Sequence, residues 1–221
     1  MELEERSMDK VRIDDIPAMF ESVAAIFAEK KDELCELDAA MGDGDLGLTM
    51  SKGYGALPDF LRETASEGDI GKQLMKGAMK MQNLVPSTMG TLMSSGVMSA
   101  GKALKGKTEL VPADIATYAT AFAAGIQKRG KCELGDRTIL DSVDAGAKKA
   151  EALVASKPDA SFADVANAAV EGANEGCEAT KDMAPKFGKA AVHAAKAKGV
   201  VDQGALAGYY MLKGIANYFA V

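Results

Sequence analysis

The 221-residue sequence contains no tryptophan, only one histidine and only 5% aromatic residues. β-Sandwiches and β-barrels draw on aromatic and β-branched side chains, so this scarcity argues against an all-β fold. Alanine, in contrast, occurs 39 times and glycine 23 times. Because alanine is the strongest helix former and small side chains let helices approach closely, the composition favours an all-α fold.

Cysteine is also scarce, and Cys35, Cys132 and Cys177 lie far apart in the sequence. No C-x-x-C pair is present, which argues against a zinc knot or a disulfide framework and favours free thiols in a reducing cytosol. Residues 1–10 are charged and lack the apolar core of a signal peptide, so we expect a cytoplasmic protein. A net charge of −6 argues against nucleic acid as a main partner, since a phosphate backbone needs a basic face.

Long apolar runs are absent as well. The longest uncharged stretch, residues 81–101, contains four serines, two threonines, a glutamine, an asparagine and a proline. It is too polar to cross about 30 Å of hydrocarbon, so we expect no membrane association. We predict a buried loop followed by a helix, with Gly96 and Gly101 at close helix contacts.

Helix start and stop signals predict about eight helices joined by short loops, with antiparallel neighbours. Pro17 fits the first turn of a helix capped by Asp14 or Asp15, and Ser161 with Asp164 resembles a capping box. There is no convincing strand pair and no internal repeat, so we expect one domain over residues 1–221. The helices are expected from Asp14 or Asp15 through Phe27, at 49–61, from 69, after Gly90, from Pro112 to 125–130, at 136–154, from 161, within 186–198, and at 203–218.

Three aspartates, Asp38, Asp43 and Asp45, lie within eight residues of a glycine-rich segment. Crowding three carboxylates is costly unless a cation lies among them, and oxygen ligands favour Mg²⁺, Ca²⁺ or Mn²⁺ over zinc. An EF-hand needs a glutamate at its twelfth loop position, where counting gives Thr49 or Tyr54. Two interpretations remain: a Mg²⁺ site completed by water and phosphate oxygens, and an exposed acidic turn without a ligand.

Two glycine patterns imitate nucleotide-binding motifs. Residues 42–47 fit G-x-G-x-x-G, but a helix precedes them and their carboxylates would repel pyrophosphate. Residues 96–103 approach a P-loop, yet Ala103 stands where Mg²⁺ needs a hydroxyl. The single histidine, His193, lies in a lysine-rich helical stretch, where a surface or packing role is favoured over catalysis. The lysines there form a solvated face, or one or two of them neutralise a nucleotide.

Four segments together resemble one known family. The segment LDAAMGDGDLGLTM is similar to the metal loop of the L subunit of dihydroxyacetone kinase, and of the related C-terminal domain in single-chain, ATP-dependent kinases. Three further segments match in the same order: the loop ending at Gly90, the GDRTILD segment at 135–141, and the GVVDQGA segment at 199–205. The resemblance covers most of the chain.

The resemblance implies a barrel of about eight antiparallel helices, with ADP or ATP bound on loops at one end. It implies that Asp38, Asp43 and Asp45 hold two Mg²⁺ ions against the nucleotide phosphates. A separate K-type subunit would hold the substrate, dihydroxyacetone or a related small ketose such as a tetrulose. The phosphoryl donor would be either exchanging ATP or a tightly held ADP that a phosphotransferase-system M-type protein rephosphorylates.

The residues that the resemblance places at the nucleotide fall into groups. Some follow the metal loop, some lie beside the phosphates, some line the adenine side, and others belong to a late nucleotide-contacting turn. In that order they are Leu46, Gly47, Leu48 and Thr49; Thr88, Met89 and Gly90, with Lys196 also facing phosphate; Gly130, Thr138 and Ile139; and Asp202 and Gly204.

Several positions differ from the family pattern. Leu46 replaces a histidine, Thr49 an asparagine and Lys196 an arginine, and residues 85–90 form a bulkier loop than usual. Lysine keeps the charge of arginine but loses its bidentate fork. The three aspartates favour a Mg²⁺-dependent phosphotransferase subunit. The altered residues around the expected nucleotide site are also compatible with a non-catalytic, nucleotide-binding regulatory paralogue.

Overall fold

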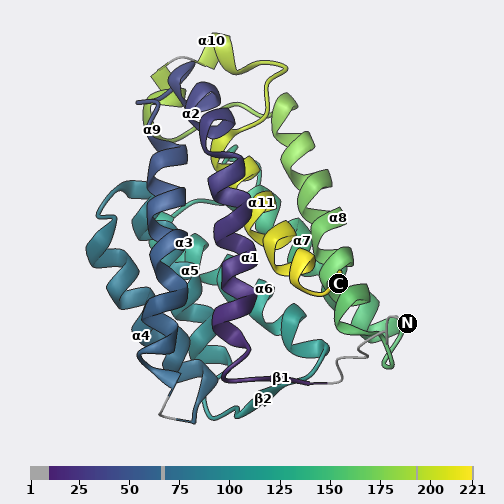
Figure 1. The fold of residues 1–221 in the computed structure, drawn as a ribbon. Helices are drawn as coiled ribbons and strands as arrows, with labels where there is room; N and C mark the ends of the chain where they lie inside the picture. The colour runs from purple at the N-terminus through teal and green to yellow at the C-terminus, as the bar shows by residue number, and fades with distance from the viewer. Residues whose placement is uncertain (1–9, 66–67, 193, 221) are drawn as a thin grey trace, which may run out of the picture.

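The chain folds mainly into α-helices, most of which run along one long axis, in a computed structural model that describes residues 10–65, 68–192 and 194–220 (Figure 1). Residues 1–9, which belong to the segment expected to lack a signal peptide, lie outside these ranges. So does His193, for which a surface or packing role was favoured over catalysis. The helices are α1 (Ile16–Glu29), α2 (Lys31–Ala39), α3 (Leu46–Arg62), α4 (Ile70–Leu84), α5 (Thr88–Ala103), α6 (Ala113–Gly130), α7 (Ile139–Ser156), α8 (Phe162–Ala179), α9 (Gly188–Val192), α10 (Ala194–Ala197) and α11 (Gln203–Tyr218). A 3₁₀ turn (Thr180–Asp182) follows α8, and β1 (Val11–Arg12) pairs with β2 (Glu109–Leu110).

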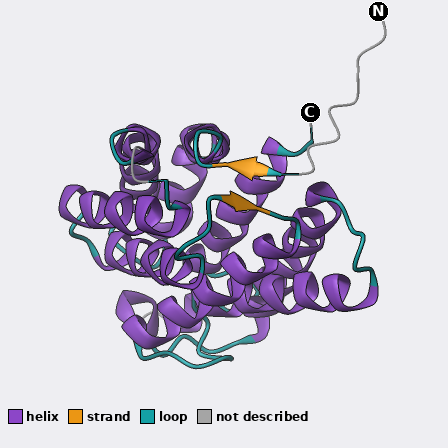
Figure 2. Ribbon diagram, turned by 90° about the horizontal axis from the view of Figure 1, so that it is seen from below, coloured by secondary structure: helices purple, strands orange, loops and turns teal. Residues whose placement is uncertain are grey.

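Eight of these helices, α1, α3 to α8 and α11, have 14 or more residues. Each packs against the next one along the chain, and α11 returns to pack against both α8 and α1. The eight therefore close into a barrel of antiparallel neighbours, and the prediction of an all-α fold with about eight helices is confirmed. The short helices α2, α9 and α10 lie at one end of the barrel and the β1–β2 pair at the other (Figures 1 and 2).

Aromatic and small residues share the core of the barrel. Phe27 and Tyr54 are fully buried, with ring centroids 4.8 Å apart. A Cβ atom on Gly96 would lie 2.6 Å from the Phe122 ring, and one on Gly101 would lie 2.8 Å from the carbonyl oxygen of Gly71. Both glycines therefore allow close helix contacts, as predicted. Within the described ranges, no helix is long and apolar enough to span a membrane.

Local signals identified several helix ends correctly. Ser161 and Asp164 form the predicted capping box of α8, and α11 spans the predicted residues 203–218. Asp15 stands at the N-cap of α1, but its carboxylate accepts the N–H of Arg12 rather than one from the helix. The cysteines Cys35, Cys132 and Cys177 are free thiols.

The structure corrects other boundaries. Helix α2 was not predicted as a separate helix, because only Lys30 separates it from α1. The β1–β2 pair was also missed, since two residues per strand leave no alternating pattern. Helix α3 begins at Leu46 rather than Thr49, and α5 begins at Thr88 within the predicted loop, because Ser87 accepts the N–H of Gly90 as its N-cap.

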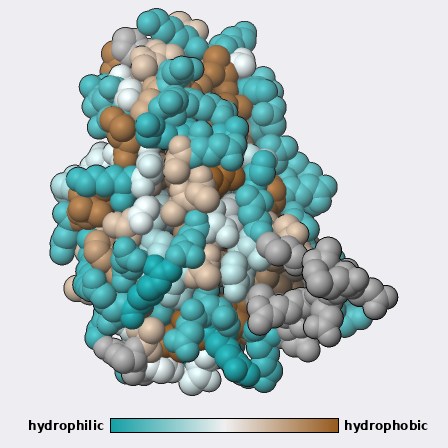
Figure 3. Space-filling view, in the orientation of Figure 1, coloured by the Kyte–Doolittle hydropathy of each residue, from teal (hydrophilic) through white to brown (hydrophobic). Residues whose placement is uncertain are grey.

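The outer face seen in Figure 3 is mostly hydrophilic, and its hydrophobic residues form small separate spots. Such scattered exposure is normal for a folded protein. Six large apolar side chains are exposed among the described residues. They are Leu48, Met79, Val111, Leu134, Phe187 and Val192.

Candidate functional site

Two adjoining cavities lie at the barrel end that carries α2 and α9. The larger, of about 600 Å³, is lined by the loop between α2 and α3, the starts of α5, α7 and α11, and the segment around α9. The smaller, of about 440 Å³, extends towards the end of α6. The two share seven residues and form one continuous concave region, lined in common by Pro86, Ser87, Thr88, Leu92, Thr138, Ile139 and Phe187.

Four helix N-termini meet at the larger cavity. Helices α3, α5, α7 and α11 begin at Leu46, Thr88, Ile139 and Gln203, and all four residues line it. These helices alternate around the antiparallel ring, so they run in the same direction and start at the same end. N-terminal N–H groups and the helix dipole favour negative charge, so the cavity suits an anionic ligand.

Asp38 organises the glycine-rich loop beside this cavity. Its Oδ2 atom accepts the N–H groups of Gly44 at 2.9 Å, Asp45 at 3.1 Å and Leu46 at 3.3 Å. Its Oδ1 atom accepts Nε2 of Gln203 at 3.3 Å. A Cβ atom on Gly42 would overlap the Asp38 carboxylate, so glycine is required there. The loop is therefore tied to α11 as well as to α3.

The other two loop aspartates are exposed carboxylates on the cavity wall. Asp43 forms an ion pair with Lys189 of α9, and this contact raises the pKa of Lys189, to which Asp38 and Asp45 also contribute. In the part of the chain that the structure describes, no three His, Cys, Asp or Glu side chains converge as a ready metal site. The three side chains are carboxylates, whose hard oxygen atoms are the type of ligand that Mg²⁺ prefers.

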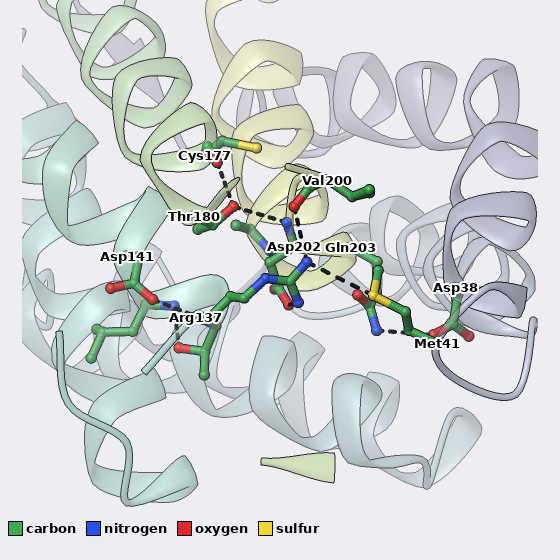
Figure 4. Close-up of polar contacts among 12 residues, drawn as sticks. Asp38, Met41, Arg137, Asp141, Cys177, Thr180, Val200, Asp202 and Gln203 are labelled. Atoms are coloured by element: carbon green, nitrogen blue, oxygen red, sulfur yellow. Dashed lines mark hydrogen bonds and ion pairs between the residues drawn. The ribbon is translucent and has the colours of Figure 1, made fainter. Parts of the chain in front are cut away.

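A buried arginine links the starts of α7 and α11 (Figure 4). Arg137 has a left-handed backbone (φ 60°), and its Nη1 lies 3.3 Å from Oδ1 of Asp202, while Nη2 donates to the Val200 carbonyl at 3.0 Å. Asp202 caps α11 by accepting the N–H of Ala205 at 2.9 Å. Burial raises the pKa of Asp202 to about 6, although Arg137 and the Ala205 N–H oppose this.

Most of the residues named from the sequence reach these cavities. Twelve line one or both: Asp38, Asp43, Asp45, Leu46, Thr49, Thr88, Met89, Gly130, Thr138, Ile139, Asp202 and Gly204.

Four others do not line either cavity: Gly47, Leu48, Gly90 and Lys196. Gly47 and Gly90 are buried against the backbone carbonyls of Lys31 and Val85, which a Cβ atom would overlap. The side chains of Leu48 and Lys196 point into solvent, on α3 and α10.

Sequence reasoning missed several lining residues. The positively charged residues that line the larger cavity are Lys189 and Arg137, whereas the sequence had placed Lys196 at the phosphates. Arg137 stood inside the GDRT segment, and Lys189 inside the lysine-rich stretch, so both were visible as candidates. Gln203 stood inside the GVVDQGA segment but was not singled out, and Phe187 carried no sequence signal.

Comparison with protein families and curated proteins gives a consistent result. The family model described as the DAK2 domain matches residues 40–217. The chain is 32% identical over 200 residues to human triokinase/FMN cyclase, covering 89% of this chain and 34% of that protein. It is 29% identical over 195 residues to the PEP-dependent dihydroxyacetone kinase 2, ADP-binding subunit DhaL, of Listeria innocua, covering 88% of this chain and 89% of that subunit.

A solved structure shares the fold. It is the dihydroxyacetone kinase from C. freundii in complex with AMP-PNP and Mg²⁺, with a TM-score of 0.68 and 22% identity. The match covers 91% of this chain and 33% of that one. The chain thus spans about a third of the length of the triokinase and of the C. freundii enzyme, and most of the Listeria subunit.

Proposed function

Because the chain belongs to the DAK2 domain family, we propose that it is the nucleotide-binding phosphotransferase subunit of a dihydroxyacetone kinase-type enzyme. The observation that carries this proposal is the meeting of four helix N-termini with a three-aspartate loop at one cavity. N-termini suit phosphate oxygens, and a carboxylate loop suits the divalent cation that accompanies them. The name of the Listeria relative, an ADP-binding subunit, supports the choice of an adenine nucleotide.

Asp38, Asp43 and Asp45 would hold Mg²⁺, two ions by analogy with the family. When bound, Mg²⁺ would neutralise the phosphates and polarise the group that is transferred. Asp38 is already fixed by the loop N–H groups, so it presents its carboxylate without reorganisation. Asp43 would exchange its ion pair with Lys189 for the metal.

The nucleotide would lie across both cavities. Its phosphates would face the first turns of α3 and α5, where Gly47, Leu48 and Gly90 contribute backbone rather than side-chain atoms. Its base would enter the smaller cavity beside Gly130, Thr138 and Ile139. Asp202 and Gly204 would border the phosphate side from the start of α11.

Phosphoryl transfer asks little covalent chemistry of the protein, so positioning and charge neutralisation dominate. This chain would hold the donor, and a separate K-type subunit would hold dihydroxyacetone or a related ketose for in-line attack. The donor is either exchanging ATP or a retained ADP rephosphorylated by an M-type protein. Gel filtration of the purified protein followed by nucleotide extraction distinguishes these, because only retained ADP co-elutes.

Calorimetric titration of ADP, with and without Mg²⁺, tests the site. We expect binding that depends on Mg²⁺ in the wild type and at least a tenfold loss in D43N, since one metal ligand is removed. D59N, in an exposed ion pair with Arg62 near the end of α3, is the matched control and should bind like the wild type. Metal-independent binding, or unchanged binding in D43N, would contradict the assignment.

Turnover separates the enzyme from a regulator. A mixture with a K-type subunit, dihydroxyacetone and Mg-ATP, or a phosphorylated M-type donor, should form the phosphorylated ketose. Nucleotide binding without turnover under either donor would instead support the non-catalytic regulatory alternative. The departures at Leu46 and Thr49, both in the cavity lining, are the observations that favour that alternative.

A further inference from the structure

One aromatic ring lies where the two cavities join. Phe187 lines both of them, and no other phenylalanine or tyrosine among the described residues lines either. Its residue is 44% exposed, whereas the other described aromatic residues are buried or half-buried. No ring in the described part of the chain stacks on it. A large apolar ring left open on a cavity wall is a surface that a ligand can cover.

The two cavities differ in chemistry on either side of this ring. The larger one contains the aspartate loop and Lys189. The smaller one lacks these, and beyond the seven shared residues it is lined by Thr91, Arg129, Gly130 and Cys132, so it has no carboxylate and a single charged side chain. A ligand with a polyphosphate at one end and a flat, weakly polar group at the other fits this division. A purine nucleotide has that shape, with its base in the smaller cavity.

Residues on both sides of Phe187 contact the rest of the barrel. On one side, Lys186 donates its N–H to the Asp136 carbonyl at 3.3 Å and forms an ion pair with the Asp136 carboxylate, which lowers the pKa of Asp136. On the other side, Lys189 pairs with Asp43. The segment that carries Phe187 is therefore attached to the barrel on both sides of the ring.

From this geometry we infer that Phe187 stacks on the nucleobase and is the residue that makes the site select a nucleotide over inorganic polyphosphate. The inference rests on the proposed function, because it concerns the same site. An aromatic side chain can stack on any base, because every base has a flat π-face. Stacking therefore contributes affinity for the base and none for the phosphates. Lys189 and the helix N-termini serve the phosphates instead.

The absence of tryptophan gives a direct test. F187W would carry the only tryptophan of the chain, placed at the junction of the cavities. With Mg²⁺ present, ADP should quench or shift its emission, and inorganic tripolyphosphate should leave the emission unchanged. A response of equal size to both ligands would overturn the inference, as would the absence of a response to ADP that calorimetry shows to be bound.

A second test compares the affinities of Phe187 variants for Mg-ADP and for Mg-tripolyphosphate, measured by calorimetry. F187A should bind Mg-ADP about tenfold more weakly than the wild type, as expected when a base loses one aromatic partner. Its affinity for Mg-tripolyphosphate should be unchanged, and F187Y should restore ADP binding. F60A removes a half-buried ring of α3 that lines neither cavity and serves as the control. Thermal unfolding followed by circular dichroism checks that each variant folds.

Failure of this inference and failure of the proposed function give different results. If the wild type binds Mg-ADP but F187A binds it equally well, the stacking role is wrong and the proposed function stands. If F187A loses ADP and tripolyphosphate affinity equally, the ring has only a structural role. A wild type that binds neither ligand overturns the proposed function, and the inference with it.

Discussion

The guanidinium of Arg137 and the carboxylate of Asp202 form a buried ion pair, 3.3 Å apart, between residues that stand 65 positions apart in the chain. Arg137 immediately precedes the N-cap of α7, and Asp202 is the N-cap of α11. The pair therefore connects two of the helix starts that line the larger cavity. Gln203, the next residue, reaches Asp38, so the same connection continues to the aspartate loop.

Removing the arginine should destabilise the fold strongly. We expect R137M to lower the free energy of unfolding by about 3–5 kcal/mol, because Asp202 would remain buried without its partner. Urea unfolding of the wild type and variant measures this. The double variant R137M/D202N should recover part of the loss, since no charge is left unpaired. K10M, which breaks the exposed Lys10–Glu109 pair, is the control and should unfold like the wild type.

Stability should depend on pH through Asp202. Its pKa in the folded protein is raised to about 6, above its ordinary value, so the folded state holds a proton that the unfolded state has released between about pH 4 and pH 6. The free energy of unfolding should therefore fall as pH rises through this window, relative to D202N. Asparagine keeps the N-cap interaction and makes D202N a conservative reference. Parallel pH profiles for the two proteins would show that Asp202 does not titrate in this range.

Lys189 should compete with Mg²⁺ for Asp43. In K189M the carboxylates of the loop lose their internal cation, so we expect tighter Mg²⁺ binding than in the wild type when no nucleotide is present. Calorimetric titration with Mg²⁺ measures the difference. K186M removes the neighbouring lysine, which pairs with Asp136 instead, and should leave Mg²⁺ affinity unchanged. Weaker binding in K189M would show that the lysine supports the metal rather than competing with it.

Two glycines at helix interiors should respond in opposite directions to the same substitution. G96A places a methyl group against the Phe122 ring and should cost about 1–3 kcal/mol, the usual range for overpacking a core. G55A points into open space on α3 and should stabilise the protein by about 0.5–1 kcal/mol, because alanine favours the helix. Thermal and urea unfolding of the two variants provides the comparison. Equal effects would contradict the close contact between α5 and α6.

Features encoded by a few neighbouring residues were predictable from the sequence. The Ser161–Asp164 capping box and the extent of α11 are of this kind, and so is the glycine-rich aspartate loop. Closure of the barrel was not, because it depends on α11 packing against α1 from the other end of the chain. Only the family resemblance implied it.

The choice between lysines shows the same limit within the site. Lys189 and Lys196 lie in one lysine- and alanine-rich stretch, and nothing in their neighbours distinguishes them. Only the packing of Ala190 and Ala197 on Met41 fixes which side of the stretch faces the cavity. Arg137 was visible within its motif, but its partner Asp202 lies in a distant segment. Nothing in the residues next to Phe187 indicates a binding role, because the cavities that it lines are formed by residues far away in the sequence.

The alternation of helix direction around the barrel constrains how this site evolves. The four helix starts face one cavity because the chain reverses its direction an even number of times between any two of them. Inserting a single helix into the ring would turn every later helix over and carry its N-terminus to the far end, so helices can be gained or lost only in pairs if the site is to survive. The side chains of Leu46 and Thr49, in the first turn of α3, are under no such constraint, since the N–H groups of the helix starts belong to the backbone.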